Sequence, residues 1–264
     1  MLTLEEGVVY AFSSTQIRME IRPLESADIE SVRRIARESL AASYSVLRDE
    51  TIETAIEEWY AADMFDDYLD SDEMVFLVAA DDDDVVGFSQ SHILETVDKG
   101  RILWLHVDPD HRGRNIATDL FDTTREMLEE RGTERITGLV LAENEEGNHF
   151  YTTHGFEKLY DRTITIADKA HVENVYGEEG TELSELEPRT ATNGEQIYID
   201  FEESSRGSDG AFHPSYLDQD RNQLYGWYCS NCETTDNAMD SMGHIECNQC
   251  GNLRKATRWD AAYL

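Results

Sequence analysis

One stretch of the chain has the residue types and spacing of a phosphate-binding loop. Residues 107–118 read Val-Asp-Pro-Asp-His-Arg-Gly-Arg-Asn-Ile-Ala-Thr, leave an apolar segment, turn at Pro109 and enter an amphipathic segment at about Asn115. The first turn of a helix has free backbone N–H groups and the positive end of the helix dipole, so it binds a diphosphate well. The sequence therefore predicts a phosphate site, with Arg112 and Arg114 adding charge. The alternative is an ordinary loop with two solvated arginines.

A second stretch with a regular spacing follows the next predicted strand. It opens with Asn144, has Tyr151 seven residues later and continues to Gly155-Phe156. In order and spacing, the two stretches resemble the acyl-CoA motif Arg/Gln-x-x-Gly-x-Gly/Ala and the second signature of the GNAT superfamily of acetyl-CoA-dependent N-acyltransferases. The resemblance covers residues 18–168.

The resemblance implies a co-substrate site and a catalytic acid. The loop and helix start are expected to hold the diphosphate, the backbone of the preceding strand and Asn144 the pantetheine, and Tyr151 is expected to protonate the departing thiolate. The implied acetyl-CoA-binding residues are Leu105, His106, Val107, Arg112, Gly113, Arg114, Asn115, Ile116, Ala117, Thr118 and Asn144. The alternatives are a buried core tyrosine for Tyr151 and a turn residue for Asn144.

Two positions depart from the family pattern. Asn115 stands where the first glycine of the loop is usual, and asparagine tolerates a left-handed backbone better than most residues. Gly147 stands where alanine is common, which weakens the short helix slightly. We expect the site to survive both changes.

The residue that accepts the amine's proton is less clear from the sequence. Acyl transfer needs a neutral amine and therefore a proton acceptor. In several family members an acidic residue or a histidine on the strand before the loop does this, but the positions here are Arg101 and Leu103, which cannot. The candidates are His92, Glu95 and His106, with a water relay as the alternative.

Four cysteines form two CxxC pairs near the end of the chain. They are Cys229, Cys232, Cys247 and Cys250, and there is no other cysteine. Two such pairs predict a tetrahedral zinc site, because each turn supplies two thiolates. Four sulfur ligands close the metal to substrate, so the predicted zinc is structural; disulfides or iron are the alternatives. His244 is a competing ligand by its position.

The predicted reaction is transfer of acetyl from acetyl-CoA to a primary amine, on a small molecule or a protein, by direct attack. The absence of cysteine from the acyltransferase half agrees with transfer that has no covalent enzyme intermediate. The alternative is a non-catalytic acyl-CoA-binding or scaffold module whose zinc ribbon docks a protein or nucleic-acid partner. The sequence leaves the acceptor and the oligomeric state open.

The elements that must position these residues follow from apolar periodicity. The pattern predicts a first strand before Pro23, helices over about 26–40 and 51–69, a hairpin over 74–94 and a strand over 102–107. A helix over 115–131, a strand over 135–141, a short helix over 145–154 and strands over 155–160 and 162–167 follow. This is a mixed, mostly antiparallel α/β sheet of the GNAT type.

Composition divides the chain into four parts. Residues 1–17 are predicted to be an N-terminal extension, 18–168 the acyltransferase domain, 169–190 an acidic linker and 191–264 a zinc-ribbon-like domain. Trp227, Tyr228 and Trp259 are expected to pack over the cysteine pairs. Arg254, Lys255 and Arg258 form the only basic cluster in the last 60 residues, which leaves a protein partner open there.

Net charge is the strongest global feature. Asp and Glu number 56 against 22 Lys and Arg, for a net charge of -34. Such a field disfavours nucleic-acid binding, and its self-repulsion is screened only in concentrated salt. The pattern predicts a halophilic, haloarchaeal protein of the cytoplasm; an acidic protein with a cationic partner is the alternative. No apolar run is long enough for a membrane span, and the N-terminus has no secretory signal.

Overall fold

A computed structural model describes residues 19–45, 47–69, 71–82, 84–94, 98–166, 169–240 and 243–256. The chain begins with a seven-stranded sheet whose strands lie in the order β1-β2-β3-β4-β5-β7-β6. Only β4 and β5 run parallel; every other neighbouring pair is antiparallel. The strands are β1 Met19–Pro23, β2 Met74–Asp81, β3 Asp84–Leu94, β4 Lys99–Val107, β5 Arg135–Leu141, β6 Phe156–Ile166 and β7 Lys169–Glu178. The predicted mixed, mostly antiparallel α/β class is confirmed.

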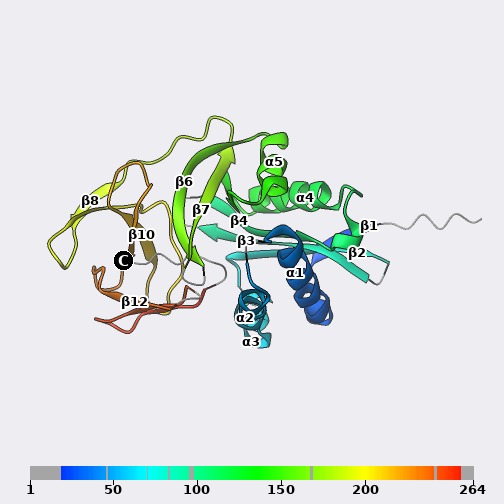
Figure 1. The fold of residues 1–264 in the computed structure, drawn as a ribbon, viewed down its shortest axis with the longest axis horizontal. Helices are drawn as coiled ribbons and strands as arrows, with labels where there is room; N and C mark the ends of the chain where they lie inside the picture. Colours follow the sequence, from blue (N-terminus) through cyan, green and yellow to red (C-terminus); the bar gives the residue numbers. More distant parts are fainter. Residues whose placement is uncertain are drawn as a thin grey trace, which may run out of the picture.

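Helices cover both faces of this sheet (Figure 1). On one face lie α1 Ile29–Ser43, α2 Asp49–Trp59 and α3 Ala62–Leu69; on the other lie α4 Ile116–Glu130 and α5 Glu145–Thr153. Two apolar cores result. One packs Trp59, Tyr60 and Phe65 against the sheet, and the other packs Phe121 and Leu128 of α4. Single-turn 3-10 helices precede α1 (Ser26–Asp28) and α4 (Pro109–His111).

Three parts of the predicted element string are wrong. The two strands expected over 155–160 and 162–167 are one strand, β6 Phe156–Ile166. The helix expected over 51–69 is two helices, because the chain breaks between Trp59 and Ala62. The segment expected to be an acidic linker is, over Lys169–Glu178, a strand in the interior of the sheet. The acidic composition of this segment concealed a buried strand in the sequence. In the structure Glu173 is fully buried because it pairs at 2.7 Å with Arg162 of β6.

The C-terminal module has two small sheets (Figure 1). A four-stranded sheet has the order β11-β10-β9-β8, and a three-stranded sheet has the order β12-β13-β14. The strands are β8 Glu187–Thr190, β9 Gln196–Ile199, β10 Phe212–Tyr216, β11 Leu224–Cys229, β12 Asn237–Met239, β13 Ile245–Cys247 and β14 Leu253–Arg254.

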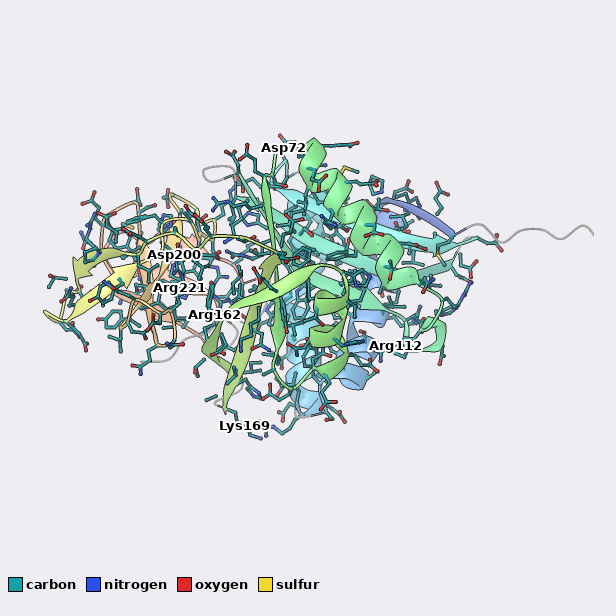
Figure 2. The ribbon with its side chains drawn as sticks, turned by 90° about the horizontal axis from the view of Figure 1, so that it is seen from above. Asp72, Arg112, Arg162, Lys169, Asp200 and Arg221 are labelled. Atoms are coloured by element: carbon teal, nitrogen blue, oxygen red, sulfur yellow. The ribbon has the colours of Figure 1, made fainter. Side chains whose placement is uncertain are left out.

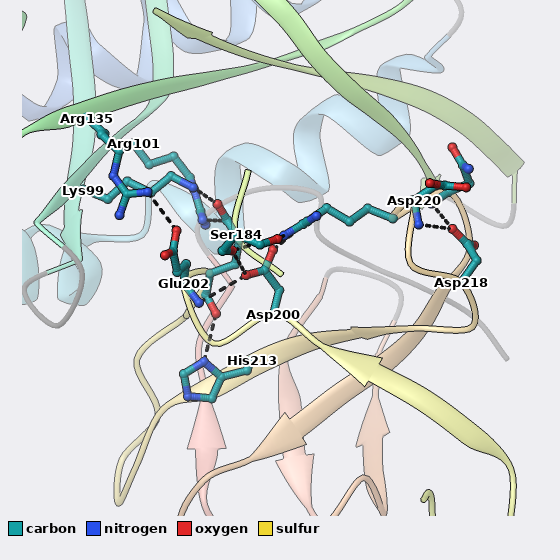
Figure 3. Close-up of polar contacts among 12 residues, drawn as sticks. Lys99, Arg101, Arg135, Ser184, Asp200, Glu202, His213, Asp218 and Asp220 are labelled. Carbon is teal, nitrogen blue, oxygen red and sulfur yellow. Dashed lines mark hydrogen bonds and ion pairs between the residues drawn. The ribbon is translucent and has the colours of Figure 1, made fainter. Parts of the chain in front are cut away.

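Ion pairs fasten this module to the large sheet (Figure 3). Buried Glu203 contacts both Lys99 and Arg101 of β4, and Glu202 accepts a hydrogen bond of 2.9 Å from Arg135 of β5. The module therefore lies against the same strands that build the predicted site. In the described ranges, every helix is too short or too polar to cross a membrane.

Candidate active site

A gap between β4 and β5 is the main feature of the predicted site. These parallel strands pair only over Lys99–Ile102 and Arg135–Gly138. Further along, β4 pairs with β3 as far as Val107, and β5 pairs with β7 as far as Leu141. The β5-facing edge of β4 over 103–107 therefore has backbone groups that no strand of the described residues pairs. Such an edge can hydrogen-bond an extended ligand as a partner strand would.

A bulge in β4 marks the point where the strands separate. Trp104 lies opposite Gln90, but Ile102 lies opposite Ser91, so Leu103 is the extra residue. A bulge bends a strand and turns its side chains locally. This bulge directly follows Ile102, the last residue of β4 that pairs with β5.

A cavity of about 420 Å³ occupies this gap. The structure brings together all but one of the residues that the sequence assigned to acetyl-CoA. Those that line the cavity are Leu105, His106, Val107, Arg112, Gly113, Asn115, Ile116, Ala117, Thr118 and Asn144, with Tyr151. Sequence reasoning missed Ser39, Ser43 and Tyr44 of α1 and its C-cap, because only tertiary packing places them in this wall.

The start of α4 has the form of an anion cradle. Gly113 and Asn115 have positive φ, of 76° and 62°, so Asn115 adopts the left-handed conformation that glycine would have supplied. Asn115 caps the helix without a side-chain hydrogen bond. The N–H groups of the first turn are thus left for a ligand in the cavity.

The two loop arginines lie differently. Arg112 lines the cavity, donates to Ser43 Oγ at 3.0 Å and pairs with Glu146 at 3.2 Å. Arg114 is not in the cavity wall; it pairs at 2.7 Å with Asp81 at the end of β2. Arg112 lies on the side of the large sheet away from the C-terminal module (Figure 2).

Asn144 is the N-cap of α5. Its Oδ1 accepts from the Gly147 N–H at 2.9 Å, and its Nδ2 donates to the Tyr44 hydroxyl at 3.3 Å. A Cβ on Gly147 would lie 2.8 Å from Asn144 Nδ2, so glycine here makes room for this side chain. The departure from alanine therefore has a local packing reason.

Tyr151 lies at the point where β4 and β5 separate. Its ring stacks on Tyr176 of β7 with centroids 5.3 Å apart, and it is buried. A Cβ on Gly138, the last β5 residue paired with β4, would lie 2.3 Å from the Tyr151 hydroxyl. The hydroxyl therefore lies at the point where β4 and β5 separate, after Ile102 and Gly138, which we call the fork.

His106 is fully enclosed between Phe88 and Trp104, with ring centroids at 5.0 and 5.1 Å. Its Nδ1 lies 3.0 Å from Ser39 Oγ, and its Nε2 has no hydrogen-bond partner. Burial, with a smaller effect of Arg112, lowers its pKa to about 3. A histidine this weakly basic is a poor proton acceptor at neutral pH.

Removing His106 should change how stability depends on pH. Below pH 6.5 the unfolded chain protonates this histidine and the folded chain does not, so folding loses stability until the pH reaches about 3. In His106→Phe this loss should disappear, and the difference from wild type should grow by about 1.4 kcal/mol per pH unit. Denaturant unfolding between pH 6.5 and 4 measures it, with His149→Phe at an exposed position as the control. Parallel curves would contradict the assignment.

The two other candidate bases are His92 and Glu95, and the structure describes only His92. His92 of β3 lines a second cavity, and its Nε2 lies 3.7 Å from Glu73 Oε2. Leu103 lines both that cavity and the first. Glu95 lies outside the described residues. His92, Glu95 and water therefore remain candidates for the role.

The four cysteines of the module converge. Their Sγ atoms all lie within 4.8 Å of one another. Cys229 and Cys250 are 3.8 Å apart at sulfur, and Cys232 and Cys247 are 3.3 Å apart. Tetrahedral zinc with Zn–S bonds of about 2.3 Å sets its sulfurs about 3.8 Å apart, so the cluster fits that metal.

The surroundings of the cluster also suit a thiolate site. Fully buried Asn252 donates to Cys229 Sγ at 3.3 Å, which stabilises a charged sulfur. Trp227 packs against the cluster, whereas Tyr228 packs on Phe201 beside the four-stranded sheet. His244 Nδ1 lies 3.0 Å from Asp240 Oδ2. Trp259 lies outside the described residues.

Comparison with known proteins separates the same two parts. Residues 38–156 match the Acetyltransferase (GNAT) family, and residues 193–264 match a family of unknown function, DUF5816. A spermidine N(1)-acetyltransferase of Thermoplasma acidophilum is 27% identical over 144 residues, which are 53% of this chain and 88% of that protein.

Solved structures share the fold of the N-terminal part. The PaiA N-acetyltransferase of Thermoplasma acidophilum, in complex with coenzyme A, has a TM-score of 0.53 and 23% identity, covering 61% of this chain and 98% of its own. A probable acetyltransferase of Staphylococcus epidermidis has a TM-score of 0.52 and 18% identity, covering 62% and 100%. The N-terminal part of the chain therefore matches the Acetyltransferase (GNAT) family over residues 38–156 and has the fold of these structures.

Proposed function

We propose that the protein transfers the acetyl group of acetyl-CoA to a primary amine by direct attack, with the co-substrate in the cavity between β4 and β5. The observation that carries this proposal is the fork itself. One cavity joins the edge of β4 that does not pair with β5, a helix N-terminus and the side chain of Tyr151. These three features suit an extended amide chain, a diphosphate and a thiolate respectively.

In the proposed reaction the amine nitrogen attacks the thioester carbonyl carbon. The C–N bond forms, the C–S bond breaks, and the sulfur leaves as a thiolate that takes the proton of the Tyr151 hydroxyl. The amine's proton passes to His92, to Glu95 or to water, and solvent returns a proton to Tyr151. No enzyme nucleophile is needed, and the four cysteines lie in the module, at residues 229–250.

We assign the cradle to residues 112–118 and the pantetheine contact to Asn144 and the β5-facing edge of β4 over 103–107. Arg112 supports the diphosphate from the cavity wall. Arg114, held by Asp81 at 2.7 Å, acts only through its charge unless that pair opens. Zinc bound by the four cysteines would supply no chemistry to the reaction; it would hold the two small sheets of the module together.

The cradle is tested by Ala117→Glu. Ala117 lines the cavity in the first turn of α4, so a glutamate there puts bulk and a like charge where the diphosphate would lie. We expect acetyl-CoA binding, measured by calorimetry, and thiol release in an amine assay to be abolished. Thr123→Glu adds the same charge on the same helix outside the cavity wall and should leave both unchanged. Unchanged affinity in Ala117→Glu would exclude this loop as the site.

The rival function is an acyl-CoA-binding or scaffold module without turnover. It shares the calorimetric result, because it uses the same cradle. It differs in the assay, where no amine would release thiol from acetyl-CoA. Thiol release that depends on an added amine therefore decides between the two.

A further inference from the structure

A second cavity, of about 510 Å³, lies where the C-terminal module meets the acyltransferase domain. Glu73 and His92 line it from the domain, and segments 205–208 and 253–255 line it from the module. The bulge residue Leu103 lines both this cavity and the one in the fork. The two cavities therefore meet at that residue.

The acetyl group of a co-substrate bound in the fork would lie close to this meeting point. Tyr151, the proposed proton donor to the thiolate, has its hydroxyl against Gly138. Gly138 pairs with Ile102, and Leu103 is the next residue of β4. The volume of the second cavity suits a small molecule. An amine held there would therefore reach the thioester past Leu103.

The pairing of β2 with β3 places Glu73 and His92 together in this cavity. Glu73 lies directly before β2, and its carbonyl oxygen accepts a hydrogen bond of 2.7 Å from the Ile93 N–H. Met74 of β2 lies opposite His92 of β3. His92 Nε2 lies 3.7 Å from Glu73 Oε2, and the two side chains are 16% and 31% exposed. Catalytic hydrogen bonds are often long until substrate binds, so this contact has the length expected of such a pair.

Glu73 is held as a carboxylate that can orient the imidazole. The contact with His92 lowers the pKa of the Glu73 carboxyl group, partial burial opposes that effect, and Arg206 adds to it. Arg206 Nη1 of the module lies 3.3 Å from the same Oε2 atom, but its side chain is 70% exposed, so this pair is weak. A carboxylate that faces Nε2 favours the tautomer with its proton on Nε2, which leaves Nδ1 as the acceptor.

We propose that Glu73 is a positioning residue for His92, and that His92 accepts the proton of an amine held in the second cavity. The inference rests on the proposed acetyltransferase function. As the C–N bond forms, the N–H proton passes to His92 Nδ1, directly or through one water. The C–S bond breaks and the thiolate takes the Tyr151 proton; solvent then removes the proton from His92 and returns one to Tyr151. Glu73 stays ionised throughout and stabilises the imidazolium that forms.

Glu73→Ala should lower kcat by about tenfold or more, because His92 loses both its orientation and the partner of its charge. KM for acetyl-CoA should stay near wild type, since Glu73 does not line the first cavity. The control is Asp72→Ala, which removes the neighbouring exposed carboxylate outside the wall of the second cavity. Thiol release is measured with spermidine, ethanolamine, β-alanine and glycinamide, and the fastest of these with wild type is used for every variant. Wild-type kcat in Glu73→Ala would overturn the inference.

Variants of His92 show whether Glu73 acts through it. His92→Ala should lower kcat by about 100-fold or more, and free imidazole should restore part of the rate, because it can occupy the space of the lost side chain. In the His92→Ala background, Glu73→Ala should cause no further loss. No rescue by imidazole, or an equal loss in both backgrounds, would reject the proposed roles. If thermal unfolding shows that His92→Ala does not fold, His92→Gln replaces it in the double-variant comparison.

The tautomer of His92 is measured without turnover, so that the two proposals fail in different ways. Nitrogen-15 NMR of the imidazole at about pH 8, above the range in which histidines usually titrate, should show the proton on Nε2 in wild type. Glu73→Ala should increase the share of the Nδ1-protonated tautomer, and His92→Gln identifies the signal by its absence. If amines release thiol but the tautomer is the same in both proteins, the inference alone is wrong. If wild type releases no thiol with any of the four amines, the acetyltransferase function fails and the proton-acceptor role fails with it.

Discussion

Tyr151→Phe is expected to lower kcat by about 10- to 1000-fold while leaving acetyl-CoA affinity nearly unchanged, the range for loss of one proton-transfer group. A phenol with a pKa of about 10 stays protonated at neutral pH and can donate to a departing thiolate. The structure adds a positional argument, because the Tyr151 hydroxyl rests on Gly138 at the fork of β4 and β5. Phenylalanine keeps the ring stacked on Tyr176, so the fold should hold.

The matched control is Tyr176→Phe. It removes a hydroxyl from the stacked neighbour, which donates to Asn148 Oδ1 at 2.9 Å and does not line the cavity. We expect its kcat to stay near wild type. Steady-state thiol release on an accepted amine and calorimetry with acetyl-CoA measure both variants. Full kcat in Tyr151→Phe across the working pH range would show that the acid role is misassigned, and a loss of stability alone would favour a core tyrosine.

Cys229→Ser combined with Cys232→Ser is expected to remove one zinc per chain and unfold the C-terminal module. A structural zinc contributes on the order of 10 kcal/mol to folding, more than a module of this size can replace. Acetyl-CoA binding should remain largely intact, because no described residue of the module lines the first cavity. Metal analysis, near-ultraviolet circular dichroism and calorimetry with acetyl-CoA check the three parts.

Ser230→Ala, between the same two cysteines, is the control, and it should keep the metal. Zinc-free protein with Cys229 and Cys232 oxidised in native lysate would overturn the zinc assignment. In the double variant Glu203 would also leave Lys99 and Arg101, so thermal stability of the acyltransferase domain should fall as well. A module that stays folded without metal would mean that its own core is sufficient.

Most of the secondary-structure elements could be predicted from local sequence patterns. The strand over residues 135–141 agrees with β5 at both ends, and the helix expected from Asn115 begins at Ile116 with Asn115 in the left-handed conformation. These segments could be predicted from the sequence because apolar periodicity and helix capping are local properties. The expected linker was misread for a related reason. Glu173 is charged in the sequence, and only the facing strand supplies the Arg162 that permits its burial.

The sequence by itself determined which residues are candidates for the chemistry of this protein. The predicted phosphate-binding loop, the Asn144 and Tyr151 spacing and the paired cysteines are residue types at fixed short separations, and short separations translate directly into local geometry. Its charge predicts salt adaptation and a cytoplasmic location, and these stay predictions. The domain boundaries were also a prediction from composition, and β7 extends the large sheet as far as Glu178.

Only the tertiary structure decided how the parts act together. The fork between β4 and β5, the wall that α1 adds to the cavity and the place of the module against Arg101 all join segments far apart in the chain. Such contacts depend on strand order and on which face each helix covers, and a single sequence does not encode either in its local pattern. The second cavity belongs to this class, because its wall joins residues between Met64 and Leu103 with the segments 205–208 and 253–255.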